Sequence, residues 1–157
     1  MTGEQLKDLI WYQRPEARLD TWRSFRQSLD DMELAQVLCE TTALWSFAPY
    51  VTYYLDPHDV RQWPDPWQLL SENYYCDLAK TLGMLYTIAL TKHKTNDLSL
   101  QVLYDQHKRE QVNIVVVNNK HVINYHFNEV VNKDDIGEHC VVKQRYTPHD
   151  LNIEQYY

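Results

Sequence analysis

Cys76 is the residue of this sequence best placed for nucleophilic chemistry. It lies in the stretch NYYCDLAKTLG, where a helix is expected to begin. The unpaired N–H groups and the dipole of a helix N-terminus favour a thiolate over a thiol. A nucleophilic cysteine also needs a base, usually His, and a third group that orients this base. His107 precedes a predicted strand and is the candidate base. A cysteine-dependent acyl-transfer enzyme or hydrolase would therefore use Cys76 and His107 as catalytic residues.

The alternative role for Cys76 is packing, because a free cysteine is often buried as a small apolar residue. The other two cysteines, Cys39 and Cys140, are widely spaced and no CxxC pair occurs, so a zinc site made of cysteines is not supported. The odd count, with an N-terminus unlike a signal peptide, favours reduced thiols. We favour packing for Cys76, and hence a chain that is not an enzyme.

Two short stretches combine histidine with acidic or thiol side chains, which are possible metal ligands. They are DPHD (Asp56, His58 and Asp59) and GEHC (Glu138, His139 and Cys140). Adjacent residues of an extended strand point to opposite faces, so the second stretch cannot bind a metal well through all three side chains. The first is better explained by capping of a helix. The chain has three Gly, too few for a phosphate-binding loop. We expect neither a metal nor a cofactor.

Aromatic residues are unusually abundant, with twelve Tyr, five Trp and three Phe. Some must form the core, but a domain of this size seldom buries all of them. Tyr and Trp also dominate the energetics of protein–protein contacts. The residues that we expect to bind a partner are Tyr53, Tyr54, Trp63, Trp67 and Tyr157.

The net charge of −7 argues against nucleic acid as a partner, because a protein that binds phosphates usually carries a basic face. The dense basic clusters lie at residues 92–94 and 107–110, in predicted turns or strand ends. The sequence has no run of about 18 apolar residues, so we expect no membrane-spanning segment.

The elements that must position these residues change character near residue 90. Residues 1–90 read as helices. Thr2 and Gln5 fit a capping box. Asp20 is expected to cap a second helix, which buries Trp22, Phe25 and Leu29, and Asp30 or Asp31 a third that Pro49 ends.

The stretch RQWPDPWQLL predicts a rigid joint between helices. Asp56-Pro57 and Asp65-Pro66 each place an N-cap before a proline at the first helical position, so both predict a helix start. Trp63 and Pro64 form an extended linker between them. A further helix is expected over residues 74–82, with Gly83 as its stop.

Residues 91–147 predict an antiparallel β meander, followed by a short polar tail. Strands are expected from Leu98 onward, and NNK is expected to form a hairpin turn with Asn at positive φ. Helices followed by strands are typical of an α+β fold, with N-terminal helices packed on a C-terminal antiparallel sheet. At 157 residues, the chain is expected to form a single domain, 1–157.

This order of elements resembles the transglutaminase-like branch of the papain-like proteins, over about residues 65–125. YYCDLAKTLGM looks like the cysteine helix of that family, with Cys76, Ala79, Leu82 and Gly83 at the matching positions. QVNIVVVNNKHVINY looks like its hairpin, in which His opens the first strand and Asp closes the second. The resemblance implies a transglutaminase-like fold and a cysteine nucleophile.

The sequence departs from that pattern at the two other catalytic positions. The place of the histidine falls at about Gln111 or Asn113, and the place of the aspartate at about Asn124. Side-chain amides cannot accept a proton from a thiol near neutral pH. The resemblance therefore implies a degenerate transglutaminase-like fold without its catalytic histidine.

A second resemblance concerns YYLDPHDVRQWPDPWQLL, with LGMLYT and VINY. These stretches look similar to a family of small uncharacterised proteins of tailed bacteriophages. The resemblance implies a structural or interaction subunit of the neck, tail or baseplate, found in the virion or, before assembly, in the host cytoplasm. Its partners would be other subunits of the particle, in a homo- or hetero-oligomeric assembly. A phage protein outside the virion that binds a host protein is a further alternative.

Overall fold

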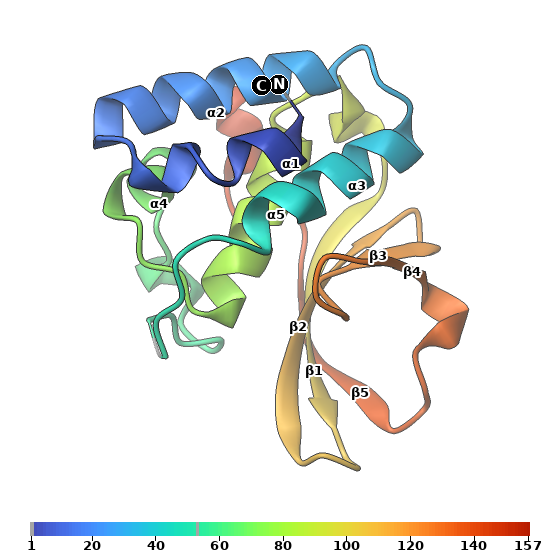
Figure 1. Ribbon diagram of the computed structural model, residues 1–157. Coiled ribbons are helices and arrows are strands. Elements are labelled where there is room, and N and C mark those ends of the chain that lie inside the picture. Colours follow the sequence, from blue (N-terminus) through green and yellow to red (C-terminus); the bar gives the residue numbers. More distant parts are fainter. Residues whose placement is uncertain (1, 53) are drawn as a thin grey trace.

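Helices form one part of the molecule and a five-stranded antiparallel sheet the other, as Figure 1 shows. The computed structural model describes residues 2–52 and 54–157. Its α-helices are α1 (Gly3–Leu6), α2 (Pro15–Leu29), α3 (Leu34–Trp45), α4 (Pro66–Glu72) and α5 (Asp77–Ala89). Its strands are β1 (Leu98–Asp105), β2 (Glu110–Val117), β3 (His121–Ile123), β4 (Val130–Asn132) and β5 (Cys140–Tyr146). The 3-10 helices are η1 (Ile10–Tyr12), η2 (Val60–Gln62), η3 (Lys92–Thr95), η4 (Lys133–Asp135) and η5 (Ile153–Tyr156).

The expected α+β class is confirmed. No helix in the described ranges is both long and apolar enough to cross a membrane.

Helix α5 lies at the centre of the core. The indole N–H groups of Trp22 and Trp45 both donate to Thr87 Oγ1, at 3.0 and 2.9 Å, so two other helices are tied to it. The expected helix stop at Gly83 is wrong, because α5 runs through this residue. A Cβ at Gly83 would lie 2.4 Å from the Trp45 ring. Glycine is therefore required here by close packing rather than by a turn.

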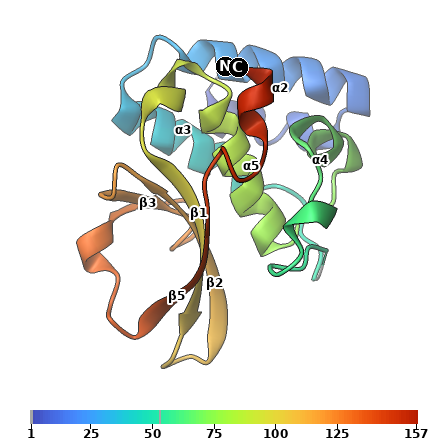
Figure 2. The ribbon, with the colours of Figure 1, turned by 180° about the vertical axis from the view of Figure 1, so that it is seen from behind.

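The sheet has the strand order β4-β3-β2-β1-β5, with every neighbouring pair antiparallel. The predicted meander is wrong in one respect, because β5 pairs with β1 rather than with β4, a short strand that the sequence reasoning missed. The predicted NNK hairpin is confirmed, with Asn118 and Asn119 at φ 56° and 54°. The β1–β2 hairpin extends away from the helices, as both ribbon views show (Figures 1 and 2).

Two predicted helix caps are confirmed and others are wrong. Thr2 forms the capping box of α1 with Gln5, and Asp65 forms that of α4, before Pro66. Asp20 lies inside α2, which begins earlier, at Pro15. The caps expected at Asp30 or Asp31 and the end expected at Pro49 are also wrong, since α3 has Glu33 as its N-cap and ends at Trp45. Asp56-Pro57 begins a turn, in which Asp56 Oδ1 accepts from the His58 N–H at 2.8 Å.

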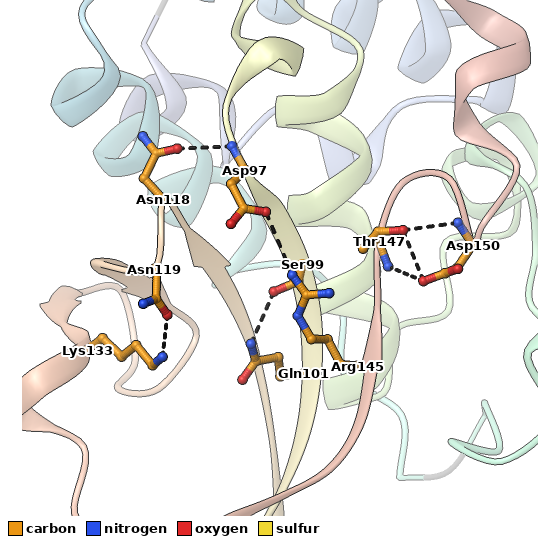
Figure 3. Close-up of polar contacts among 9 residues, drawn as sticks. All are labelled: Asp97, Ser99, Gln101, Asn118, Asn119, Lys133, Arg145, Thr147 and Asp150. Carbon is orange, nitrogen blue, oxygen red and sulfur yellow. Dashed lines mark hydrogen bonds and ion pairs between the residues drawn. The ribbon is translucent and has the colours of Figure 1, made fainter.

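Side-chain hydrogen bonds connect the segments that flank the strands (Figure 3). Asn118 Oδ1 accepts from the Asp97 N–H at 3.0 Å, and Asn119 accepts from Lys133 Nζ. Beyond β5, the Asp150 carboxylate accepts from the N–H and the hydroxyl of Thr147 at 2.8 and 3.0 Å. The segment after Pro148 is not a purely polar tail, because Ile153 is fully buried.

Candidate functional site

A cavity of about 840 Å³ lies where the N-terminus of α5 meets β2. We call it the Cys76 cleft. The side chains that matter for its chemistry are Tyr50, Tyr54, Cys76, Asp77, Gln111, Asn113 and Asn124, all of which line it. The cleft is therefore built from the loop before η2, the start of α5, one strand and the residue that follows β3.

Cys76 is the N-cap residue of α5, with extended backbone at φ −72° and ψ 173°. Its carbonyl accepts from the Lys80 N–H at 3.0 Å and so begins the helix. The residue is 5% exposed and lines the cleft. Cys76 therefore packs in the core and also stands at a helix N-terminus.

Side-chain amides surround the carboxylate that follows Cys76. Asn113 Nδ2 donates to Asp77 Oδ2 at 2.8 Å, and Asn124 Nδ2 donates to Asp77 Oδ1 at 3.2 Å. Asn124 Nδ2 also approaches Thr81 Oγ1 at 2.8 Å and the Asn113 carbonyl at 3.0 Å. Gln111 Nε2 donates to Asn113 Oδ1 at 2.8 Å. The positions where the transglutaminase-like resemblance places His and Asp are therefore brought to the cleft, but they carry amides bonded to Asp77.

The amides of this network cannot act as a general base. An amide nitrogen accepts no proton near neutral pH, so neither Asn113 nor Asn124 can take one from Cys76. Asp77 accepts two hydrogen bonds from these amides, and the sequence pattern assigned it no role. The signal that could have found it is its place directly after Cys76, in the first turn of α5.

Lys80 adds a cation one turn along α5. Its Nζ donates to the Ser46 carbonyl at 3.2 Å and lies 5.8 Å from the centre of the Tyr50 ring. Burial lowers the pKa of Lys80, and Asp77 opposes this shift. The ammonium is thus held between the end of α3 and Tyr50, a residue that lines the cleft.

The structure does not bring His107 to Cys76. His107 lies in the β1–β2 turn, beyond Glu110, and its ring stacks on that of His139 at 4.1 Å between centroids. At about 3.4 Å per strand residue, Glu110 is already roughly 10 Å along β2 from Asn113. Among the described residues that line the cleft there is no histidine.

The aromatic residues expected to bind a partner have different environments. Tyr53 lies outside the described residues. Tyr54 is 39% exposed at the rim of the cleft, where its hydroxyl donates to Glu72. Tyr157 is 48% exposed, beneath Lys94 Nζ. Sequence reasoning missed Tyr50, which is 64% exposed and lines the cleft.

The two tryptophans of WPDPW belong mainly to the fold. Trp63 is buried, donates from Nε1 to the Asp56 carbonyl at 2.8 Å and packs edge-on against Tyr146. Trp67 keeps 36% of its surface exposed and packs between Trp22 and Tyr156. The predicted cap and helix start at Asp65-Pro66 are confirmed, and each indole packs on a different element.

Comparison with solved structures supports the architecture. The structure of Legionella pneumophila LapG matches this chain with a TM-score of 0.69 at 10% sequence identity, covering 94% of this chain and 83% of LapG. LapG has a transglutaminase-like fold, and the weak transglutaminase-like resemblance of the sequence is therefore confirmed. At this identity the likeness shows the fold alone. No protein-family model matches the sequence, and no curated protein matches it.

Proposed function

We propose that this protein is a non-catalytic interaction subunit that binds an extended segment of a partner protein in the Cys76 cleft. The observation that carries the proposal is the pair of amides at the places where the resemblance puts the catalytic histidine and aspartate. Asn113 and Asn124 both donate to Asp77, so amides that accept no proton stand where the resemblance expects the base of Cys76 and the group that orients it.

The edge of β2 supports an extended partner. Strand β3 pairs with β2 only at residues 115–117. In the part of the chain that the structure describes, no strand pairs with residues 110–113 on the side away from β1. The Asn113 carbonyl accepts from Asn124 on that side, so the backbone N–H and carbonyl of Gln111, two residues away, also point there. A free strand edge that lines a cavity can bind a peptide as an added strand.

Exposed aromatic side chains border this edge. Tyr50 and Tyr54 line the same cleft and keep much of their surface in solvent. Tyrosines contribute large contact areas at little cost in side-chain entropy. We propose Tyr50 and Tyr54 as the anchors for partner side chains beside the β2 edge.

A substitution in the strand edge tests this mode of binding. Gln111→Pro removes the outward N–H and leaves the ladder with β1, because a proline is tolerated at an edge. Gln111→Ala is the matched control, which removes only the side chain. We expect co-purification of the bound partner, from cells that express both proteins, to be lost in Gln111→Pro and kept in Gln111→Ala. Equal binding by both variants would refute the strand-addition mode.

We further propose that the partner is another subunit of a tailed-phage particle, in the neck, tail or baseplate. The support for this is the likeness of the WPDPW region to phage proteins, together with the aromatic surface. Quantitative mass spectrometry of purified particles of the encoding phage tests it. A copy number fixed at a multiple of six or twelve, as in the symmetric rings of tails and necks, is the expected result. Absence from particles would favour instead a role in the host cytoplasm, bound to a host protein.

The second candidate function is a cysteine-dependent acyl-transfer enzyme or hydrolase. It is favoured by the position of Cys76 at a helix N-terminus within a cleft of a transglutaminase-like fold. Alkylation with iodoacetamide, followed residue by residue with mass spectrometry, separates the two functions. We expect Cys76 to react more slowly than the exposed Cys39 at every pH. Faster labelling of Cys76 that persists at acidic pH would establish an activated nucleophile.

A further inference from the structure

Three side chains with metal-binding chemistry meet at the far end of the sheet, outside the Cys76 cleft. They are Asp105, the last residue of β1, His139, in the turn before β5, and Cys140, the first residue of β5. One ligand atom from each lies within 4.8 Å of the others. We call them the Asp105 cluster. Asp105 and Cys140 are directly paired across the β1–β5 ladder, so their side chains point to the same face.

The turn explains why two adjacent residues converge here. The sequence interpretation of GEHC assumed an extended strand, in which neighbours point to opposite faces. His139 instead lies in a turn, and only Cys140 belongs to β5. Glu138 is exposed and is not part of the cluster. The three residues of GEHC therefore do not converge, as expected, but His139 and Cys140 do.

The Asp105 carboxylate is oriented with one oxygen toward the cluster. Its Oδ1 accepts from the N–H groups of His107 and Lys108 at 2.9 and 3.0 Å. Its Oδ2 faces His139 Nε2 at 3.8 Å, with the Asp105 side chain only 5% exposed. This separation is too long for a hydrogen bond. It is somewhat longer than the roughly 3.4 Å between an oxygen and a nitrogen ligand of a tetrahedral zinc ion, so a small side-chain movement brings both to one ion.

The imidazole of His139 has two close neighbours, His107 and Gly137. The His107 ring stacks on it with an interplanar angle of 4°. Gly137 lies against the Nδ1 and Cε1 atoms of the ring, because a Cβ at Gly137 would clash with both. The ring therefore presents Nε2 to Asp105. His107, assigned by sequence reasoning as the base for Cys76, is here a positioning residue for His139.

We propose that Asp105, His139 and Cys140 bind one divalent transition metal ion of the zinc class. Carboxylate oxygen, imidazole nitrogen and thiolate sulfur are the three ligand types that zinc takes in proteins, whereas calcium and magnesium take oxygen alone. Binding releases the thiol proton of Cys140 to solvent, and the two negative ligands then balance the charge of the ion. The hydroxyl of Tyr125 lies 3.9 Å from Cys140 Sγ and can donate to the thiolate. Water fills the fourth position.

Titration of the full-length, metal-free protein with Zn²⁺ and with Co²⁺ tests this site. Cobalt bound to a thiolate gives a charge-transfer band in the near ultraviolet, so the band reports the cysteine ligand directly. We expect one ion per chain. Loss of an outer-shell partner costs about 10–100-fold in affinity, so loss of a ligand in Cys140→Ser or His139→Ala should cost more than about 100-fold.

Matched variants distinguish this site from any other thiol and from unfolding. Cys39→Ser and Cys76→Ser should leave the cobalt band and the zinc affinity unchanged. Asp105→Asn keeps an oxygen that accepts from His107 and Lys108, so the turn is retained while a charged ligand is lost. Wild-type affinity in His139→Ala, or a band that disappears with Cys76 or Cys39 rather than with Cys140, would overturn the proposal. So would a folded wild-type protein that gives no band.

Discussion

The Cys76 cleft and the Asp105 cluster use similar residue types to opposite effect. In the cleft, the fold supplies a cysteine at a helix N-terminus, but the side chains facing it are amides that hold Asp77. In the cluster, the resemblance to a known fold assigns nothing, yet acidic, imidazole and thiol groups converge. The cleft has amides where the resemblance expects His and Asp, and the cluster brings together His, Asp and Cys at a place where no resemblance expects them.

The difference teaches that architecture and reactivity are set by different residues. Apolar residues of α5 and the strands determine the transglutaminase-like fold, and they tolerate a change of the polar side chains on the cleft. A single change from imidazole to amide removes a general base while it keeps a hydrogen-bond donor of similar size. The following substitutions would break or sharpen this contrast.

The largest effect is expected from returning a base to the cleft. Asn113→His would place an imidazole where Asp77 can orient it, since Asn113 Nδ2 already lies 2.8 Å from the carboxylate. We expect the alkylation rate of Cys76 to rise on the order of 100-fold at neutral pH, the scale of general-base assistance. The rate is measured by mass spectrometry against Cys39 in the same sample. Asn113→Gln is the control without a base. No acceleration in Asn113→His would show that the cleft lacks more than a base.

A larger side chain at Gly83, in the middle of α5, should destabilise the whole molecule. In Gly83→Ala the new methyl group would meet the buried Trp45 ring, and overpacking of this kind costs about 1–3 kcal/mol. Chemical denaturation measures the change in the free energy of unfolding. Trp45→Phe removes the six-membered part of the indole that the methyl group meets, so Gly83→Ala should cost less in that background. An unchanged cost in both backgrounds would mean that the close contact is relieved by backbone movement.

The carboxylates of Asp77 and Asp105 should differ in how much they contribute to the free energy of unfolding. Asp77→Ala leaves Asn113 and Asn124 without their shared acceptor, which should cost about 1–2 kcal/mol of unfolding free energy. Asp105→Asn should cost less in the metal-free protein, because an amide oxygen still accepts from the turn. Thermal unfolding of the two variants side by side measures this order. A larger loss of thermal stability in Asp105→Asn than in Asp77→Ala would show that the charge of Asp105 stabilises the metal-free fold.

The smallest effect concerns the turn that follows β5 (Figure 3). The N–H and then the hydroxyl of Thr147 bond to Asp150 and hold the pKa of its carboxyl below the ordinary value of 3.8. A lowered pKa stabilises the folded state above pH 3.8, and this contribution is lost as the pH falls through the folded-state value. Asp150→Asn should therefore lower the melting temperature slightly at pH 7. The difference in melting temperature between Asp150→Asn and wild type should shrink toward pH 3. A difference that stays constant down to pH 3 would contradict this role of Asp150.

Local sequence patterns predicted much of the secondary structure that positions the cleft. The capping boxes of α1 and α4, the Asn turn between β2 and β3 and the helix after Cys76 all follow from a few adjacent residues. Where sequence reasoning failed, a distant contact decided the outcome. Gly83 was read as a stop because glycine often ends a helix, but its neighbour in space is Trp45, 38 positions earlier in the chain.

The same distinction holds for the two sites. The sequence by itself determined that Cys76 begins a helix and that amides stand at the places of His and Asp, because both depend on spacing within short segments. Only the tertiary structure decided that those amides meet at Asp77, that Trp63 is buried, and that His107 stacks on His139. It alone brought Asp105 beside Cys140, 35 residues further on, because β5 returns to pair with β1 rather than with β4. Strand order depends on packing of the whole chain, and no local pattern specifies it.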